Sequence, residues 1–323
     1  MQRIRLVSRG SQLALWQSHH VRDRLRAAHP DLEVEVVVVK TTGDRITDVP
    51  LSRIGDKGLF TKEVDDALLD GRADAAVHSL KDVPTRVPPG LELGAIVERV
   101  DPRDVFLAAP GRPTRLADLA PGARVGTSSL RRRSLLGAVR PDLVVEDFRG
   151  NLDSRLQKLR EGRFDAAILA LAGIRRLGLE DAVGEVLQPP GWLPAVGQGA
   201  LGITIREGDA GAATLLAPLE HAATRHATTA ERAFLRTLEG GCQVPIGALA
   251  ETHGSGVSLS GFVASLDGRC ILRDSVTGAA ADAAELGRGL AERLLDRGAG
   301  ALLAEVRAAV EGPGENPPPP AAP

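Results

Sequence analysis

Residues 3–40 read RIRLVSRGSQLALWQSHHVRDRLRAAHPDLEVEVVVVK, and this stretch decides the fold. Its apolar start at residues 4–7 predicts a short strand, and the Val-rich run at residues 33–40 predicts a second one. Between them, apolar side chains recur at helical spacing from Leu13 to Ala28, with Ser11 as the expected N-cap. A strand, a helix and a strand in this order predict a βαβ unit with parallel strands.

The same alternation continues downstream and predicts two α/β units, each with a mainly parallel sheet. We interpret Asp101-Pro102-Arg103-Asp104 as the point where the chain crosses from the first unit to the second. The further strands are expected at residues 74–78, 124–126, 143–147, 165–171 and 201–206, and the helices at residues 61–69, 128–138 and 151–160. The last of these strands stands alone and could return to the first unit.

The C-terminal third predicts a small α+β unit. A long helix is expected at residues 222–238, followed by two strands at residues 257–264 and 270–277 and helices at residues 281–297 and 300–310. Residues 311–323 contain six prolines, which predicts a disordered tail. The predicted domains are residues 1–100 with 200–217, residues 104–194, and residues 220–310.

Composition narrows the classes of function. The chain has 323 residues and a net charge of −2, which does not favour a general polyanion binder. With six Phe, two Trp and no Tyr, it has few aromatic rings on which nucleic-acid bases could stack. Residues 1–9 lack the apolar core of a signal peptide, and the run at residues 166–174 is too short to cross a bilayer. We therefore expect a cytoplasmic protein with neither nucleic-acid nor membrane partners. None of its seven His shows metal-ligand spacing with a Cys, so no metal is expected.

Basic and hydroxyl side chains follow the predicted strands. Ligands of parallel α/β sheets bind beyond the carboxyl ends of the strands, where helix N-termini add free N–H groups. The residues in these places are Arg9, Ser11, Lys81, Thr127, Ser129, Arg131, Arg132, Arg149, Arg155 and Arg176. Arg131–Arg133 taken alone could be a solvated helix face, but cations at five strand ends together predict a cleft for a small polyanion.

Asp82 is an acid among these bases. A carboxylate in a cationic pocket ionises readily and suits stabilising a developing cation or moving protons on a substrate nitrogen. It could equally pair with Lys81 or cap a turn.

Two cysteines, Cys242 and Cys270, are expected to be free thiols in a reducing compartment. Cys242 follows Gly240-Gly241, which predicts a loop after a helix, whereas Cys270 starts a strand and is expected to be packed or inert. A loop thiol near Arg side chains is the more reactive kind.

Seven segments, in this order, resemble the hydroxymethylbilane synthase (porphobilinogen deaminase) family, and the resemblance spans nearly the whole chain. They are SRGSQLAL (8–15), GLFTKE (58–63), AVHSLKDVP (76–84), GTSSLRR (126–132), RGN (149–151), LPAVGQGA (193–200) and EGGCQVP (239–245). The last of these resembles the family's cofactor-attachment motif.

The resemblance implies a monomer with two α/β domains like the lobes of periplasmic-type binding proteins around a cleft, plus a small α+β C-terminal domain. It implies a transferase that joins four molecules of porphobilinogen head to tail and releases ammonia each time, after which water releases the linear hydroxymethylbilane. A covalent dipyrromethane cofactor, one per chain, would prime this reaction through a thioether to Cys242.

The resemblance also implies roles for single residues. Asp82 would be catalytic: it would contact pyrrole nitrogens, assist loss of the amine and stabilise the cationic methylene-pyrrole intermediate. Residues implied to bind the cofactor besides Cys242 are Lys81, Asp82, Thr127, Ser129, Arg131, Arg132 and Arg155. Residues implied to bind the substrate are Arg9, Ser11, Arg149, Arg176 and Gln198.

The polar segment at residues 41–58 is expected to form a lid that contains Arg53 and Lys57. The family usually has Lys where this chain has Arg53, and Arg keeps the charge. A two-lobed anion-binding protein without catalysis is the alternative from another class, because the cationic cleft alone supports it almost as well.

Overall fold

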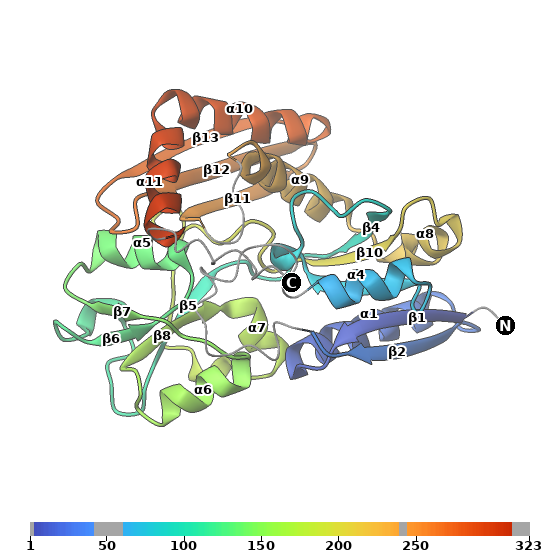
Figure 1. Cartoon of the computed structure of the whole chain (residues 1–323), viewed down its shortest axis with the longest axis horizontal. Coiled ribbons are helices and arrows are strands. Elements are labelled where there is room, and N and C mark those ends of the chain that lie inside the picture. The colour runs from blue at the N-terminus through green and yellow to red at the C-terminus, as the bar shows by residue number, and fades with distance from the viewer. Residues whose placement is uncertain (1–2, 42–60, 239–243, 312–323) are drawn as a thin grey trace, which may run out of the picture.

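The computed structural model describes residues 3–41, 61–238 and 244–311, which form three sheets with helices packed on them (Figure 1). The predicted lid residues Arg53 and Lys57, the predicted attachment residue Cys242 and the predicted tail at residues 312–323 lie outside the described residues.

The first unit contains a five-stranded sheet in the order β2-β1-β3-β10-β4. Its strands are β1 (Arg3–Arg9), β2 (Glu33–Val39), β3 (Ala75–Ser79), β4 (Leu91–Val97) and β10 (Leu201–Arg206). Its helices are α1 (Gln12–Ala28), α4 (Lys62–Leu69) and α8 (Ala210–Leu216). The expected N-cap is confirmed, because the Ser11 side chain accepts a hydrogen bond from the Ala14 amide.

The second unit contains a five-stranded sheet in the order β7-β6-β8-β5-β9. Its strands are β5 (Asp104–Ala108), β6 (Arg124–Gly126), β7 (Val144–Glu146), β8 (Ala166–Ala170) and β9 (Glu185–Val186). Its helices are α5 (Leu130–Val139), α6 (Leu152–Arg160) and α7 (Leu171–Arg176). The chain passes between the two sheets twice, from β4 to β5 and from β9 to β10, so two crossing segments connect the two units.

The C-terminal unit is a three-stranded antiparallel sheet covered by helices, and Figure 1 shows it in orange and red beside both α/β units. Its elements are α9 (Ala222–Thr237), β11 (Ile246–His253), β12 (Gly256–Ala264), β13 (Ile271–Ala279), α10 (Ala283–Asp296) and α11 (Ala299–Glu311). Short 3-10 turns lie at Leu80–Asp82, Leu116–Asp118, Glu180–Ala182, Ala217–Leu219 and Ala280–Asp282. The predicted fold class of two α/β units and a small α+β unit is confirmed.

The expectation of mainly parallel sheets is confirmed, because four of the five strands in each sheet run the same way, but both sheets are mixed and contain one reversed strand. In the first sheet β1 pairs in parallel with β2 and β3, whereas β10 runs antiparallel to β3 and β4. The second sheet has the same pattern, with β5 antiparallel to β8 and β9. In each sheet the antiparallel strand directly follows a crossing segment. The chain therefore enters that sheet at the end opposite to the one where its other strands begin.

The sequence predicts two strands in the C-terminal unit, and the structure has three. The missing one is β11, whose sequence Ile246-Gly247-Ala248-Leu249-Ala250 contains Gly and Ala, which have low β-propensity. Close packing explains these small residues, since a Cβ at Gly247 would meet Phe262 and the Pro194 carbonyl. Cys270 is exposed in the turn before β13, so of the two expected alternatives, packed or inert, the packed one is wrong.

The C-terminal unit packs tightly on the second unit. One hydrophobic core is shared by Val125 and Leu135 of the second unit and Leu249 and Phe262 of the C-terminal unit. The turn between β12 and β13 touches the backbone of α5, where a Cβ at Gly137 would meet the Asp267 carbonyl. Helix α5 is therefore held in place from outside the unit that contains it.

Candidate active site

A cavity of about 730 Å³ lies between the two α/β units, at the carboxyl ends of β1, β3, β6 and β8. This is the edge at which parallel α/β sheets bind ligands. The predicted site residues that line it are Arg9, Ser11, Lys81, Asp82, Thr127, Ser129, Arg132, Arg149, Arg155, Arg176 and Gln198. The structure thus brings together eleven residues that lie up to 189 positions apart in the chain.

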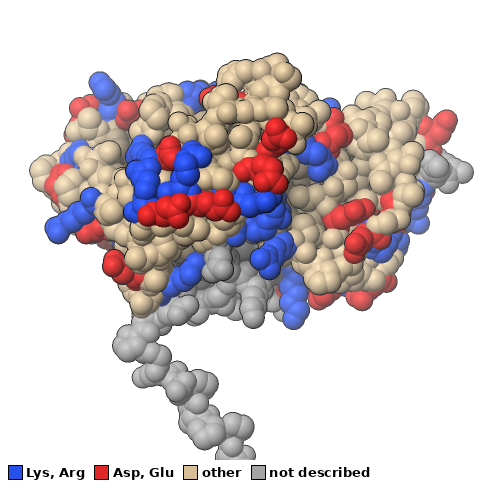
Figure 2. All heavy atoms as spheres, turned by 90° about the horizontal axis from the view of Figure 1, so that it is seen from above, with Lys and Arg blue, Asp and Glu red and all other residues tan. Residues whose placement is uncertain are grey.

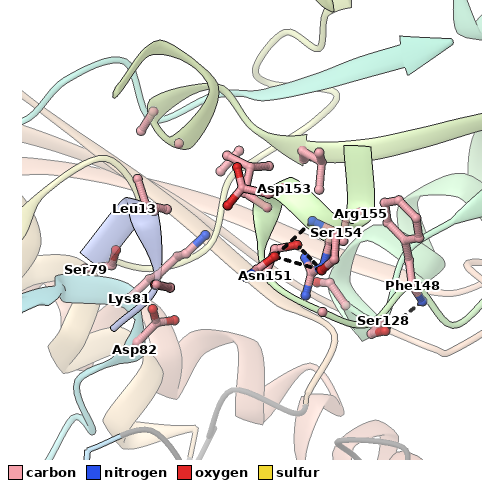
Figure 3. Close-up of a pocket in the computed structure, with 18 of the residues that line it drawn as sticks. Leu13, Ser79, Lys81, Asp82, Ser128, Phe148, Asn151, Asp153, Ser154 and Arg155 are labelled. Atoms are coloured by element: carbon pink, nitrogen blue, oxygen red, sulfur yellow. Dashed lines mark hydrogen bonds between the residues drawn. The ribbon is translucent and has the colours of Figure 1, made fainter. Parts of the chain in front are cut away.

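The first unit contributes one acid, Asp82, and three bases, Arg9, Lys40 and Lys81. Arg9 ends β1, and Lys81 and Asp82 lie in the 3-10 turn that follows β3. Figure 3 shows Lys81 and Asp82 on one side of the cavity, with Asn151, Ser154 and Arg155 on the other. Asp82 is exposed, and the described part of the chain gives its carboxylate no hydrogen-bond donor. This position leaves its oxygens open to a ligand in the cavity.

The second unit directs two helix N-termini toward the cavity. Ser129 caps α5 by accepting from the Arg132 amide, and Asn151 caps α6 by accepting from the Ser154 amide at 2.9 Å. Both caps line the cavity, so the positive ends of both helix dipoles lie beside it. Gly150, which precedes the second cap, has φ +115°, and a Cβ there would meet Ser154. The turn thus needs glycine.

Three arginines around the cavity have a buried Nε atom without a hydrogen-bond partner in the described part of the chain: Arg132, Arg155 and Arg176. Burial lowers the pKa of Arg155 and that of Arg176 to about 10, so both remain cationic at neutral pH. Buried donors without partners are unfavourable unless a ligand satisfies them. These atoms fit a ligand that has several carboxylates.

Arg176 also connects the two α/β units. Its Nη2 donates to the Gly199 carbonyl at 2.8 Å, and its guanidinium lies 5.8 Å from the centre of the Trp16 ring on α1. The guanidinium is thus held by an aromatic face and a carbonyl at the wall of the cavity.

Lys81 is a cation whose charge depends on its surroundings. Its Nζ donates to Gln198 Oε1 at 3.3 Å. Burial is the main cause that lowers the pKa of Lys81 to about 8, and the charge of Asp82 acts in the opposite direction. Lys81 is therefore protonated at neutral pH and loses its proton in mildly alkaline solution.

Arg131 is placed differently from the other predicted residues. It does not line the cavity, and its Nη1 donates to Asp104 Oδ2 and to the Leu193 carbonyl, both at 2.8 Å. Its neighbour Arg132 does line the cavity. Successive residues of a helix point about 100° apart, so only one of the two can face the ligand.

Asp104 has no predicted role, although it belongs to the predicted crossing point Asp101–Asp104. Asp104 is fully buried beneath the cavity and pairs with Arg131 and Arg132. Phe148 was also missed; it is buried, lines the cavity, and its ring lies 5.9 Å from the Arg155 guanidinium. A lone Asp and a lone Phe give no pattern that would have identified them.

The charge of the cavity contrasts with that of the outer surface. Figure 2 shows a face on which Lys and Arg lie beside Asp and Glu.

Among the described residues, no three of the His, Cys, Asp and Glu side chains gather in a way that could hold a metal ion. Within the same part of the chain, no helix has the length and apolar character needed to cross a membrane.

Comparison with known families and proteins agrees with this cavity. Residues 4–214 match the family model "Porphobilinogen deaminase, dipyromethane cofactor binding domain", and residues 226–296 match "Porphobilinogen deaminase, C-terminal domain". A porphobilinogen deaminase of Roseiflexus castenholzii is 54% identical over 92% of this chain and 97% of its own length. One of Gloeobacter violaceus is 54% identical over 95% of this chain and 94% of its own length.

Among solved structures, the periplasmic VFT2 domain of BvgS from Bordetella pertussis is similar to 68% of this chain, and the match covers 86% of that domain, with 15% identity and a TM-score of 0.41. The sequence matches are far stronger and include both halves of the molecule. The chain belongs to the porphobilinogen deaminase family.

Proposed function

We propose that this chain is a hydroxymethylbilane synthase in which Asp82 is the catalytic residue and the surrounding cations bind carboxylates. The transferase reaction joins four porphobilinogen molecules head to tail, releases one ammonia at each step, and ends when water releases the linear tetrapyrrole. One observation carries the assignment of residues: an exposed carboxylate faces buried arginines whose Nε atoms lack partners in the described part of the chain.

Carboxylate binding follows from the cations of the cavity. Each pyrrole ring of the substrate has an acetate and a propionate, and arginine offers forked donors that match such groups. Arg132, Arg155 and Arg176 have unused buried donors, and the caps of α5 and α6 add helix N-termini. We assign the carboxylates of the growing chain to this wall and to Arg149, and those of the incoming ring to Arg9 and Ser11, which lie across the cavity.

Asp82 suits the chemistry at the pyrrole nitrogen. Its carboxylate can accept a hydrogen bond from the pyrrole N–H and stabilise the positive charge that develops as the C–N bond of the aminomethyl group breaks. Lys81 lies next to it in the same 3-10 turn and can bind a substrate carboxylate, which would hold the ring in register with Asp82.

The family's cofactor is dipyrromethane, and the cavity fits a group with four carboxylates because buried donors await acceptors there. When bound, this group supplies the pyrrole ring to which substrate rings are added. We propose that Cys242 attaches it through a thioether. The motif EGGCQVP (239–245) supports this, as does the position of α9, which ends at Thr237, five residues before Cys242.

The alternative of a two-lobed anion-binding protein without catalysis is not favoured, because the matched relatives are enzymes in name and match both halves of the chain.

We further propose a cytoplasmic monomer with domains at residues 1–100 with 200–217, 104–194 and 220–310. The first two boundaries are supported by the two α/β sheets, which have the same arrangement of strands, and by the two segments that cross between them. Light scattering should give one chain of 33.9 kDa.

Intact mass and product analysis of the purified protein test the proposal. We expect hydroxymethylbilane from porphobilinogen and a mass excess equal to two pyrrole units. Cys242→Ser should lack both, whereas the control Cys270→Ser should keep both, because Cys270 is exposed in a turn outside the cavity. An active protein without the mass excess would contradict the attachment.

A further inference from the structure

Asp104 is the first residue of β5 and has 0% exposure, yet it is ionised beneath a cavity that it does not line. Its carboxylate accepts four hydrogen bonds. Oδ1 accepts from Arg132 Nη2 and Gln198 Nε2, each at 2.8 Å. Oδ2 accepts from Arg131 Nη1 at 2.8 Å and from Trp192 Nε1 at 2.9 Å. A carboxylate has about four acceptor sites, so Asp104 is saturated by the protein itself.

The contacts with Asp104 determine how Arg132 faces the cavity. Arg132 Nη2 bonds to Asp104, and Nη1 donates to the Ile168 carbonyl at 2.9 Å. Both outer nitrogens are thus engaged on the protein side. The Nε atom stays buried without a partner in the described part of the chain, and the residue lines the cavity. Two of the three nitrogens thus fix the plane of the guanidinium at the edge of the cavity.

Asp104 also determines the orientation of the Gln198 amide. Gln198 Nε2 donates to Asp104 Oδ1 and to the Pro102 carbonyl at 2.7 Å, both of which are acceptors. The amide can therefore be placed only one way round, with its oxygen toward Lys81 Nζ. A short chain of contacts thus runs from Asp104 through Gln198 to Lys81, the neighbour of Asp82.

We propose that Asp104 is a positioning residue for the reaction: it orients Arg132 and, through Gln198, Lys81, without touching the substrate. The inference rests on the proposed function, since it assigns the two cations to carboxylates of the ligand. Asp104 lies at the start of β5 in the second unit. Through Gln198 it is connected to Lys81, which lies in the same turn of the first unit as Asp82.

The position requires a charged carboxylate and not merely a polar side chain. The cations of Arg131 and Arg132 hold the pKa of Asp104 well below its usual range, so it stays ionised. An asparagine could still accept hydrogen bonds through one oxygen, but its NH₂ group would face two donors, those of Arg131 and Trp192 or those of Arg132 and Gln198. Asp104→Asn thus keeps the shape of the side chain and removes two acceptor contacts and the charge.

The central experiment compares Asp104→Asn with the control Asp101→Asn. Asp101 also pairs with two arginines, Arg103 and Arg175, but none of these three lines the cavity. For Asp104→Asn we expect a smaller fraction of molecules with the cofactor mass and a loss of about a hundredfold in kcat/KM for porphobilinogen in those that have it. Asp101→Asn should resemble the wild type in both measurements.

A pH profile separates positioning from a merely structural role. The charge of Asp104, like that of Asp82, raises the pKa of Lys81, whereas Arg131 and Arg132 lower it. Without Asp104 the alkaline limb of kcat/KM should therefore move to lower pH. Wild-type cofactor occupancy, kcat/KM and alkaline limb in Asp104→Asn would overturn the proposal. A wild-type enzyme that makes no hydroxymethylbilane would instead contradict the proposed function.

Gln198→Met provides the second variant, because it leaves the bonds of Asp104 to Arg131, Arg132 and Trp192 in place. It removes the Gln198 amide, which contacts Lys81, Asp104 and the Pro102 carbonyl, but keeps the charge of Asp104 and its bonds to both arginines, so the chain should fold even if Asp104→Asn does not. We expect a KM for porphobilinogen that is raised about tenfold or more with little change in melting temperature. A KM equal to that of the wild type would overturn the proposed connection.

Discussion

Arg99 and Glu231 form a two-pronged salt bridge between the crossing segment after β4 and helix α9 of the C-terminal unit. Arg99 Nη1 lies 2.6 Å from Glu231 Oε1, and Nη2 lies 3.2 Å from Oε2. The Glu231 side chain is fully buried, and it also accepts from the amides of Gly197 and Ala250. One carboxylate therefore ties together the first crossing, the segment before β10, and β11.

Glu231→Ala should destabilise the whole protein. It would leave both outer nitrogens of Arg99 and two amides without their acceptors, and breaking a buried ion pair costs about 3–5 kcal/mol. We expect this loss in the free energy of unfolding, measured by urea denaturation. Glu285→Ala is the control, because the salt bridge of Glu285 with Arg288 is solvent-exposed. Equal stability of the two variants would show that the buried bridge contributes nothing.

Asp82→Asn should keep the cofactor and lose turnover. Asn keeps the size of Asp82 but lacks the charge that stabilises the developing cation, and such general acid–base groups contribute about 10²–10⁴-fold. We expect a kcat lowered by about that factor and an unchanged intact mass. Asp153→Asn removes the same charge from the same cavity and should keep most of its turnover. Equal losses in the two variants would indicate that net charge, not Asp82 itself, matters.

Local patterns predicted many elements well. The βαβ unit at residues 3–40, the strand β10 and the helix α9 all have strong periodicity, and their predicted bounds lie within a residue or two of the observed ones. The direction of β5 and β10 within their sheets depends on which end of the sheet the crossing segment reaches. That is a tertiary property, so no local pattern could reveal it. β11 was missed because its small residues serve packing against Phe262 and Pro194.

The candidate site was predictable as a set of residues but not as a geometry. The cations after the strands of a parallel sheet must share one edge, so their gathering followed from the order of the elements. Which of Arg131 and Arg132 faces the ligand depends on the exact start of α5 at Leu130. The role of Asp104 depends on four contacts from distant segments, and no spacing in the sequence encodes them.

The pH dependence of substrate binding should follow the loss of the proton from the Lys81 side chain. The pKa of this group lies at about 8 in the folded chain, against 10.5 in its ordinary state, because burial disfavours the charge. Carboxylate binding should therefore weaken above about pH 8, and KM for porphobilinogen should rise. Lys81→Arg should retain binding to higher pH, since arginine keeps its proton. Because the substrate's own ionisation is the same for both enzymes, the difference between the two KM profiles isolates Lys81.

The same group should affect stability in the opposite direction. Between pH 8 and 10.5 the unfolded chain retains the Lys81 proton while the folded chain has lost it. Stability rises with pH wherever the unfolded state binds more protons. Between pH 8 and 10.5, the contribution of Lys81 should therefore raise the free energy of unfolding while KM for porphobilinogen also rises. A free energy of unfolding whose Lys81 contribution falls over the pH range in which KM rises would show that another group controls binding.

Arg155 should illustrate a conflict between function and stability. Its Nε is buried without a partner in the described part of the chain, and burial together with the charges of Arg132 and Arg149 lowers its pKa to about 10. The folded state therefore holds this cation at a cost that a bound carboxylate would offset. We expect Arg155→Met to raise the free energy of unfolding of the cofactor-free protein by about 1–3 kcal/mol and to lower cofactor occupancy.

Arg160→Met is the matched control, because Arg160 lies on the same helix but is exposed to solvent. It should change neither stability nor cofactor occupancy appreciably. Urea denaturation and intact mass measure the two properties on the same samples. If Arg155→Met were less stable than the wild type, the guanidinium would be held by favourable contacts with the protein. It would then be part of the scaffold, and the carboxylates would have to be bound by the remaining cations of the cavity.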